Sequence, residues 1–292
     1  MSRVPYPRPF VPAAPAAGGG ATLPDDPAAV LLDAGNPSTL TGLDEAGVGT
    51  SYTPAAARQL LGLATDPGLP SSGLVALWRA SSLSLADGAP VSTWAPASGT
   101  PGSLTGSGSA RPTYRAAGSP SGGPCVEFDG SDDELSLSSP AGLPSGAGAG
   151  TMVAIVSRCG HNGSLSFIAQ YGSSSTARGR GLGLNSTKWH LLDYAADLTA
   201  DSDYDGARHP RGVVLTHWYD GTTRRLVVDG VPIKSSTTAL NTGASALHLG
   251  RSLAGGERAS FRIMALAIYS AALSDAALAQ IQTHARAAHG VA

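Results

Sequence analysis

The chain has 292 residues, only 14% of them charged, and its formal net charge is −2. A nucleic-acid-binding protein usually carries a basic stripe, and this sequence has none. It has no run of 18 apolar residues either, so we expect no membrane-spanning helix. The 38 glycines and 21 prolines favour many turns and short strands over long helices.

Residues 1–20 are predicted to form an extended arm. Prolines punctuate this segment and three glycines end it, a composition typical of a polyproline path with a flexible joint. Tyr6, Phe10 and Val11 stand among the prolines, and an arm that docks in a groove of a neighbouring subunit would use them. A disordered tail is the alternative. The prolines also interrupt any apolar segment of a signal peptide, so we expect a protein made and kept in the cytoplasm until a route other than ordinary secretion releases it.

Residues 21–73 have too few apolar side chains to bury a core alone, and we interpret them as an anchoring and oligomerisation segment. A helix is predicted at 54–63, because Thr53 is a good N-cap and Pro54 suits the first helical position. A helix of about ten residues is marginal alone in water. It must therefore bury its apolar side against the β-domain or against copies of itself. That side consists of Leu60, Leu61 and Leu63.

The segment "TPAAARQLLGLA", residues 53–64, resembles the "aaaRxxLGLg" element near the N-termini of bacteriophage tail-fibre and head-fibre proteins. In those proteins the element packs around a threefold axis. The resemblance implies that this segment anchors the chain to a particle and assembles it as a homotrimer. An ordinary linker helix is the alternative.

Residues 74–292 have the pattern of an antiparallel β-domain. Val126 and Phe128 alternate with polar residues, and the nearly continuous apolar run 151–158 is typical of a strand covered on both faces. Asp220-Gly221 indicates a hairpin. Many short strands without alternating helices indicate a two-sheet sandwich.

One helix is predicted at the end of the chain. Ser274 is a good N-cap, and Leu273 and Leu278 occupy the positions of a hydrophobic staple. Gly290 lies just past the predicted end.

Several pieces of residues 74–285 resemble the laminin-G-like, concanavalin-A-like jelly-roll family, in the family's order. They are "LVALWRA…DGAPVSTWAPASG…ARPTY", "CVEFDGSDDELSL" and "RRLVVDGVPI…ALHLGRS…FRIMALAIYSAALSDAALAQI". Met264 stands where the family often has glycine, which affects a bulge. The resemblance implies two packed antiparallel sheets and, commonly, glycan or protein binding. We therefore expect an all-β, two-sheet antiparallel jelly-roll sandwich with an extended N-terminal arm, one short N-terminal helix and one C-terminal helix.

A group of aromatic and polar residues suggests a glycan site, because sugar rings stack on aromatic faces while carboxylates and amides bind hydroxyls. The candidate ligand-binding residues are Trp189, His190, Tyr194, Tyr204, Arg178 and Arg180. Core packing is the alternative role for Trp189. The two arginines form a basic loop that would meet an acidic polysaccharide or a neighbouring subunit.

The segment "DSDYDG", residues 201–206, matches the first half of a calcium loop. Asp201, Asp203 and Asp205 alternate before a glycine, as oxygen ligands do in such loops. Gly212 stands where the bidentate glutamate would be. Calcium is therefore one interpretation, and a solvated turn is the other.

We expect no catalytic residues. The chain contains neither a G-x-S-x-G nucleophile elbow nor an H-E-x-x-H motif, and Glu127 before Asp129 resembles a sheet-surface residue. The two cysteines, Cys125 and Cys159, are expected to be free, with later pairing left open.

Together these features predict a virion structural protein: a head or tail fibre or decoration protein of a phage or phage-like particle. Its partners would be capsid or tail proteins, copies of itself and a host-surface polysaccharide. A free bacterial carbohydrate-binding module is the alternative. A glycan hydrolase or lyase is less favoured, because the sequence lacks the paired carboxylates that such enzymes use. Head and tail locations both stay open.

Overall fold

The computed structural model describes residues 68–203 and 212–291 in full, and before them the backbone of three short strands. The chain divides into two compact units, Met1–Asp66 and Pro67–Ala292. The first unit contains the antiparallel sheet β1 (Val30–Leu32), β2 (Leu40–Leu43) and β3 (Gly49–Tyr52). The sequence analysis predicted no strand in this segment.

The predictions for the rest of the first unit lie outside the described residues. They comprise the helix at 54–63 and the residues assigned to oligomerisation and anchoring: Leu60, Leu61, Leu63, Tyr6, Phe10 and Val11.

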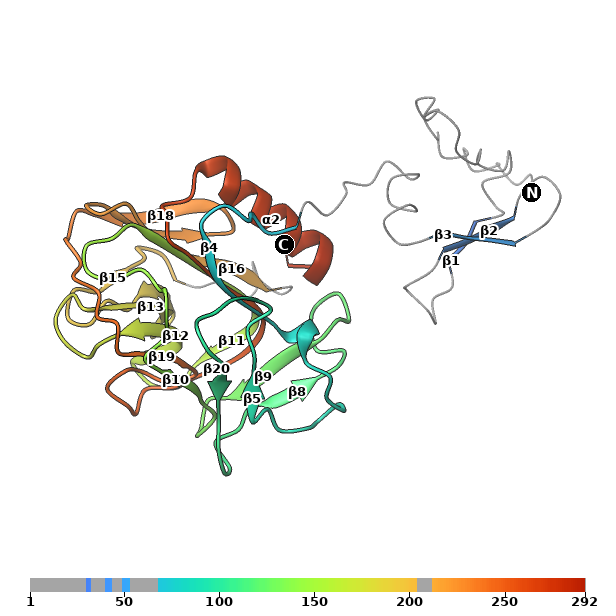
Figure 1. Ribbon diagram of the computed structural model, residues 1–292, viewed down its shortest axis with the longest axis horizontal. Helices are drawn as coiled ribbons and strands as arrows, with labels where there is room; N and C mark the ends of the chain where they lie inside the picture. The colour runs from blue at the N-terminus through green and yellow to red at the C-terminus, as the bar shows by residue number, and fades with distance from the viewer. Residues whose placement is uncertain (1–29, 33–39, 44–48, 53–67, 204–211, 292) are drawn as a thin grey trace, which may run out of the picture. The chain divides into compact units, whose positions relative to one another are not determined.

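The second unit is a sandwich of two antiparallel sheets with one C-terminal helix, as the sequence predicted (Figure 1). Sheet I contains, in spatial order, β18 (Val231–Ser236), β17 (Arg224–Val228), β16 (Val213–Tyr219), β11 (Gly150–His161), β20 (Ala259–Tyr269), β4 (Leu74–Arg79) and β6 (Ser98–Gly99), with β9 (Cys125–Asp129) and β8 (Thr113–Arg115) beside β20. Sheet II contains β15 (Leu198–Thr199), β14 (Lys188–Leu191), β13 (Gly179–Asn185), β12 (Leu165–Gly172), β19 (Ala246–Leu249), β10 (Leu135–Ser138), β7 (Leu104–Thr105) and β5 (Thr93–Trp94). A 3₁₀ turn, η2 (Ala80–Ser82), follows β4.

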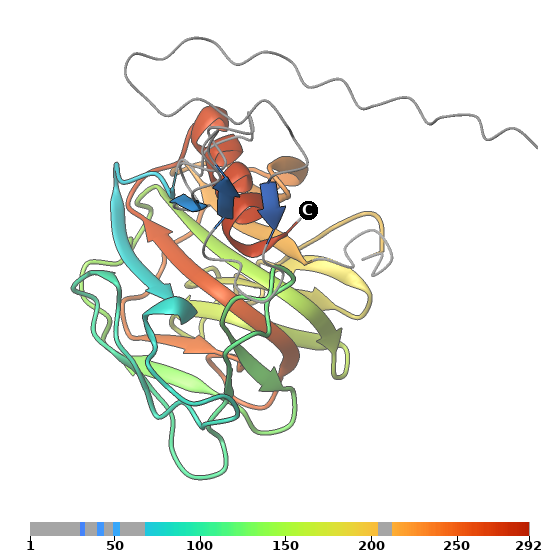
Figure 2. The same ribbon diagram turned by 90° about the vertical axis from the view of Figure 1, so that its right-hand side faces the viewer.

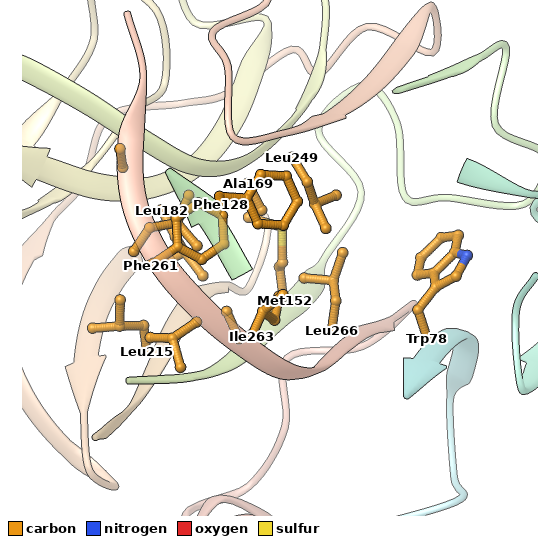
Figure 3. Close-up of a cluster of buried hydrophobic side chains, with 14 of the residues drawn as sticks. Trp78, Phe128, Met152, Ala169, Leu182, Leu215, Leu249, Phe261, Ile263 and Leu266 are labelled. Carbon is orange, nitrogen blue, oxygen red and sulfur yellow. The ribbon is translucent and has the colours of Figure 1, made fainter. Parts of the chain in front are cut away.

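The main core lies between the two sheets (Figure 3). Met152 of β11 points into it together with Leu215 of sheet I and Leu182 of sheet II. Phe128 and Phe261 stack there with ring centroids 4.5 Å apart. The alternate residues of β11 face the other way, so the prediction that this strand is covered on both faces is confirmed.

Helix α2 (Asp275–His289) covers the outer face of sheet I (Figure 1). The Ser274 hydroxyl accepts a hydrogen bond from the Ala277 N–H, and Gly290 adopts the left-handed conformation at the C-terminal end. Leu278 and Ile281 are buried against the sheet. The predicted capping and the predicted apolar face are therefore both confirmed.

Strand β20 runs through the middle of sheet I (Figure 2). It contains a bulge at Met264. Opposite β11, the register passes directly from Ala265 to Ile263. Ile263 pairs with β9 and Ala265 pairs with β4, so the bulge lies where β20 changes neighbours.

Both cysteines are free thiols in the structure. Cys125 is buried in the layer between sheet I and α2, and this burial raises the pKa of its thiol to about 11. It is therefore a poor nucleophile at neutral pH. Among the described residues, none of the helices has the length and hydropathy needed to span a membrane.

Candidate binding pocket on sheet II

Small and polar residues cross the outer face of sheet II. They are cross-strand neighbours on β13, β12, β19, β10 and β7, and therefore share one face. In spatial order they are Gly181, Gln170, His248, Ser136 and Thr105. This face thus offers hydrogen-bonding groups where sheet I offers apolar ones.

A bulge in β12 sets which of its side chains point outward. The register skips one residue between Phe167 and Ala169, opposite β13. Ile168 and Ala169 both lie in the core as a result. The bulge therefore places Phe167 and Gln170, three residues apart, on the same outer face.

The Gln170 side chain lies across β13 and joins the two segments that flank the centre of this face. Its Nε2 donates to the Leu192 carbonyl at 2.6 Å, and its Oε1 accepts from the Leu253 N–H at 3.0 Å. The glycines beneath it leave room for this crossing: a Cβ at Gly179 would lie 3.0 Å from Gln170 Nε2, and one at Gly181 would lie 2.9 Å from Gln170 Cγ. The alternating glycines of β13 are therefore a steric requirement of this arrangement.

A pocket of about 200 Å³ opens beside Gln170, between residues 194–197 and the loop 252–257. Its lining includes Phe167, Gln170, Tyr194, Asp197, Ser252 and Glu257. The pocket thus combines apolar surface with an amide, a phenol and two carboxylates, the mixture that small-ligand sites typically show.

Two residues at the rim of the pocket have strained backbone. Tyr194 has φ 56° and Ala195 has φ 55°, in the left-handed region that residues other than glycine seldom adopt. The Ala177 N–H donates to the Tyr194 carbonyl at 2.9 Å. Strain of this kind persists only where surrounding contacts enforce it.

A buried ion-paired cluster supplies those contacts. The Asp193 carboxylate is fully buried; its Oδ1 lies 2.7 Å from His217 Nε2, and its Oδ2 accepts from Arg224 Nη1. A second Arg224 nitrogen contacts the Asp197 carbonyl at 3.5 Å. Burial by itself would raise the pKa of Asp193, but the attraction of His217 and Arg224 outweighs it and lowers that pKa. The cluster fixes both ends of the 193–197 turn to sheet I.

The two pocket carboxylates differ in how they are held. The Ser252 hydroxyl donates to Glu257 Oε2 at 2.5 Å. Asp197 Oδ2 lies 3.6 Å from His190 Nε2, and the other ring nitrogen of His190 is 2.8 Å from the Thr199 hydroxyl. The Ser252 contact fixes the Glu257 carboxylate as a hydrogen-bond acceptor for a ligand, whereas the Asp197 carboxylate is exposed and lies beyond hydrogen-bond distance of His190.

The structure separates the residues that the sequence analysis grouped as glycan-binding. Tyr194 lines the pocket and is half-buried. Trp189 is 3% exposed and lies in the core, which was its alternative role. His190 is 2% exposed and lies behind Asp197. Burial thus removes Trp189 and His190 from direct contact with an external glycan.

The two predicted arginines also lie in different environments. Arg180 is 1% exposed: its Nε donates to the Thr242 hydroxyl at 2.7 Å, and its guanidinium lies over the Tyr219 ring at 4.9 Å. It is a structural residue and not part of a basic surface loop. Arg178 is exposed and outside the pocket lining. Tyr204 lies outside the described residues.

The predicted calcium ligands have other partners where they are described. Asp201 pairs with Lys234 at 2.5 Å, and Asp203 accepts from the Thr187 hydroxyl at 2.8 Å. Asp205 lies outside the described residues. The Asp201 carboxylate is therefore already neutralised by an ammonium group.

A different set of acidic residues comes together at the β9–β10 turn. Within the described part of the chain, oxygens of Asp129, Asp132 and Asp133 lie within 4.8 Å of one another. Asp133 accepts from the Asp129 N–H at 2.8 Å, and burial raises the pKa of its carboxyl to about 6. Its neutral form is thus favoured at mildly acidic pH.

Sequence reasoning missed Gln170, Asp197 and Glu257. They lie on three segments far apart in the chain, and no local motif connects them. The alternating glycines of residues 179–183 were the available signal, because glycine inside a strand often marks close approach of other groups.

No protein-family model matches the chain, and no curated protein sequence matches it. Solved structures are similar in fold. Domain 4 of AbnA, a GH43 extracellular arabinanase from Geobacillus stearothermophilus solved in complex with arabinotriose, has a TM-score of 0.51 at 14% identity, covering 73% of this chain and 100% of that domain. The binding domain of Paraclostridial Mosquitocidal Protein 1 has a TM-score of 0.51 at 10% identity, covering 72% of this chain and 52% of that one.

A Trypanosoma rangeli sialidase has a TM-score of 0.49 at 17% identity, and the match covers 76% of this chain and 34% of the sialidase. This chain therefore spans about a third of the sialidase's length. At such identities the similarity concerns the fold, and it agrees with the two-sheet sandwich that the strand pairing shows.

Proposed function

We propose that the second unit is a carbohydrate-binding domain and that the sheet II pocket receives one residue of a glycan. The observation that carries this proposal is the convergence of the Tyr194 ring, the Asp197 and Glu257 carboxylates and the Gln170 amide around one pocket. The ring offers an apolar face to a sugar's C–H groups, and the fixed oxygens accept hydrogen bonds from its hydroxyls.

The size of the pocket supports a single sugar residue as the occupant. Its volume of about 200 Å³ is below the roughly 300–1,000 Å³ of pockets that enclose drug-sized ligands. One ring would enter it, and the rest of a longer glycan would continue along the polar row of sheet II. The arabinanase domain, which the match covers over its full length, was solved with arabinotriose, and this supports an oligosaccharide as the ligand class.

We propose binding without catalysis. Ser252 holds the Glu257 carboxylate as a hydrogen-bond acceptor, and the exposed Asp197 carboxylate is a second acceptor; neither role needs proton transfer. The hydrolase alternative requires one of them to act as an acid and the other as a base or nucleophile. Release of reducing sugar from a glycan that binds the domain would contradict the proposal.

A glycan array with the purified protein, with and without a chelator, tests the ligand class and any need for calcium together. The variant Tyr194→Gly removes the ring and relieves the left-handed backbone at the same position. We expect it to weaken glycan binding about tenfold or more, the equivalent of about 1.4 kcal/mol. Ala177→Gly is the matched control: it relieves another left-handed residue, outside the pocket lining, but keeps the ring, and should bind like wild type. Equal binding by both variants would overturn the assignment of the pocket.

We further propose that this domain is displayed by a virion structural protein, a head or tail fibre or decoration protein of a phage or phage-like particle. The support is the resemblance of residues 53–64 to the phage fibre element and the proline-punctuated arm before it. Assembly as a trimer would add avidity, so weak binding at each pocket would suffice for host attachment.

Sedimentation of the full chain and of residues 67–292 tests this second part. We expect a trimer that becomes a monomer on truncation. A monomeric full-length chain that still binds glycans would instead support a free carbohydrate-binding module.

A further inference from the structure

A second pocket lies on sheet I, where α2 ends. It has a volume of about 250 Å³ and is lined by residues 117–120, Ser157, Arg158 and Arg262. Ser121 attaches the 117–120 loop to the helix, since its N–H and its hydroxyl both donate to carbonyls of the last turn of α2. The walls of this pocket therefore belong to the ordered part of the sandwich.

The pocket has more positive than negative charge. Glu127 is shared by two guanidinium groups, those of Arg115 at 2.5 Å and Arg262 at 3.0 Å. Asp87 also attracts Arg115. Arg158 is exposed and has no ion pair within the described part of the chain. One guanidinium charge at the pocket is thus uncompensated.

Arg262 retains hydrogen-bonding capacity for a ligand. Its Nε and Nη2 donate to Glu127, and its Nη1 donates to the Gly118 carbonyl at 3.1 Å. A guanidinium has five N–H donors, so two remain. Glu127 and Gly118 thereby fix the orientation of the group while leaving donors unused.

The Ser157 hydroxyl is an independent sign of a missing ligand. Ser157 is 3% exposed, and its Oγ has no hydrogen-bond partner among the described residues. Ser157 is the cross-strand neighbour of Arg262, so their side chains share one face. A buried hydroxyl without a partner destabilises the fold unless a bound group satisfies it.

We propose that this pocket binds a small oxyanion: a sulfate, phosphate or carboxylate group. Arg158 and Arg262 supply charge-assisted hydrogen bonds, and the Ser157 hydroxyl donates a third. The volume is several times the roughly 30 Å³ that one water occupies, so the oxyanion fits with part of its hydration shell. The group belongs either to a free inorganic ion or to an acidic sugar.

Calorimetric titration and thermal melting test the proposal, with sodium sulfate, sodium phosphate and sodium acetate compared with sodium chloride at equal ionic strength. We expect a saturable rise in melting temperature with at least one oxyanion and none with chloride. Arg158→Ala should weaken oxyanion binding about 10- to 100-fold, the range for losing one or two charge-assisted hydrogen bonds. Arg178→Ala, at an exposed arginine away from the pocket, is the matched control and should bind like wild type.

Ser157→Ala separates ligand binding from folding. Without oxyanion its melting temperature should equal or exceed that of wild type, because an unpaired buried hydroxyl is removed; with oxyanion its affinity should fall about tenfold. A response to oxyanions that is identical in wild type and Arg158→Ala would overturn the proposal. So would a Ser157→Ala protein that melts lower without any oxyanion.

A sulfated disaccharide compared with inorganic sulfate identifies the source of the group. Tighter binding of the disaccharide, lost in Arg158→Ala, would assign the pocket to an acidic glycan, and equal binding would assign it to the free ion. The Tyr194→Gly variant should keep its oxyanion binding, so a failure of the sheet II proposal leaves this one standing. Loss of oxyanion binding in that variant would place the ion in the other pocket and contradict the inference.

Discussion

The outer faces of the two sheets differ in what covers them. Sheet I presents Val153, Ile155 and Val227 to the apolar side of α2, and this layer is buried almost as completely as the main core. Sheet II presents glycines and polar side chains, of which Gln170 is held in place by two backbone groups. The first face is built to be covered by the chain itself, and the second is built to hold hydrogen-bonding groups in place.

This difference separates stability from function in one fold. Burial of apolar area favours folding whatever the outside of the protein contacts. The hydrogen bonds of a polar row on a sheet contribute little net free energy to folding. The ordered positions of these groups are therefore more useful for binding a ligand than for stability. Variants on the covered face should accordingly lose stability, and variants on the polar face should lose ligand binding.

The largest effect is expected at the cluster that joins the pocket to the sandwich interior. Asp193→Asn leaves the buried Arg224 guanidinium without its carboxylate, and removing one partner of a buried pair typically costs about 3–5 kcal/mol. We expect that loss in the free energy of unfolding by urea, together with weaker glycan binding. Asp203→Asn, at an exposed position, is the control and should stay within about 0.5 kcal/mol of wild type.

The Asp193 carboxylate also predicts how the stability of the fold changes with pH. The pKa of Asp193 is lower in the folded state than the ordinary value of about 3.9, so its contribution is fully present above that pH and is lost as the pH falls through the folded pKa. The stability gap between wild type and Asp193→Asn should therefore be widest at neutral pH and narrow below about pH 4. A gap that widens in acid would show that the carboxylate is not stabilised as the cluster implies.

The next effect concerns the covered face. Ile281→Ala removes a side chain that is 1% exposed and faces sheet I, and such truncations cost about 2–4 kcal/mol. Urea unfolding should show this loss, whereas glycan and oxyanion affinities of the folded protein should not change. Arg286→Ala, on the exposed side of the same helix, should cost no more than about 0.5 kcal/mol. A loss of glycan binding in Ile281→Ala would mean that the two faces are coupled.

A substitution at Gly181, beneath Gln170, should destabilise the fold less than Ile281→Ala does, but it should weaken glycan binding more. A Cβ at Gly181 would lie 2.9 Å from Gln170 Cγ and 2.9 Å from the Leu192 carbonyl oxygen. Gly181→Ala should therefore cost about 1–3 kcal/mol and displace the amide from the pocket. Gln170→Ala removes the amide without crowding Leu192 and provides the comparison: it should lose glycan binding with a stability cost of about 1 kcal/mol. Normal binding by both variants would show that the amide does not contact the ligand.

The smallest expected effect is a gain in stability, whereas the others are losses. Ala195→Gly relieves a left-handed residue at the pocket rim and should raise the free energy of unfolding by about 0.5–1 kcal/mol. Thermal melting is sensitive enough to detect such a gain. A decrease would show that the turn gains more from a stiff residue than it loses to strain.

The fold was predictable from sequence because its signals are local. The alternation around Phe128, the apolar run 151–158 and the Asp220-Gly221 turn each indicate one element without reference to the rest. The same holds for Ser274 and Gly290 at the two ends of α2. The short strands of the first unit lacked such signals, since three or four residues cannot show a period.

The pocket was only partly predictable because it depends on a change of alternation. A strict period of two would place Ala169 outward and Gln170 in the core, but the bulge at Ile168 reverses them. Tyr194 was found because aromatic residues are few, and Glu257 was not, because its partner segments are remote in the chain. A second bulge, at Met264, coincides with the position where the family resemblance differs.

That second bulge has a consequence for how β20 can change over evolution. Ile263 points to the main core, Met264 and Ala265 both point to α2, and Leu266 points to the core again. The extra residue therefore interrupts the alternation of side chains between the two faces of the strand. Deleting Met264 would remove the bulge and restore strict alternation, with Ile263 and Leu266 still facing the main core and Ala265 still facing α2. Strand β20 is thus one residue longer than its alternation needs, and a chain without Met264 would keep both packed layers at the cost of one buried side chain.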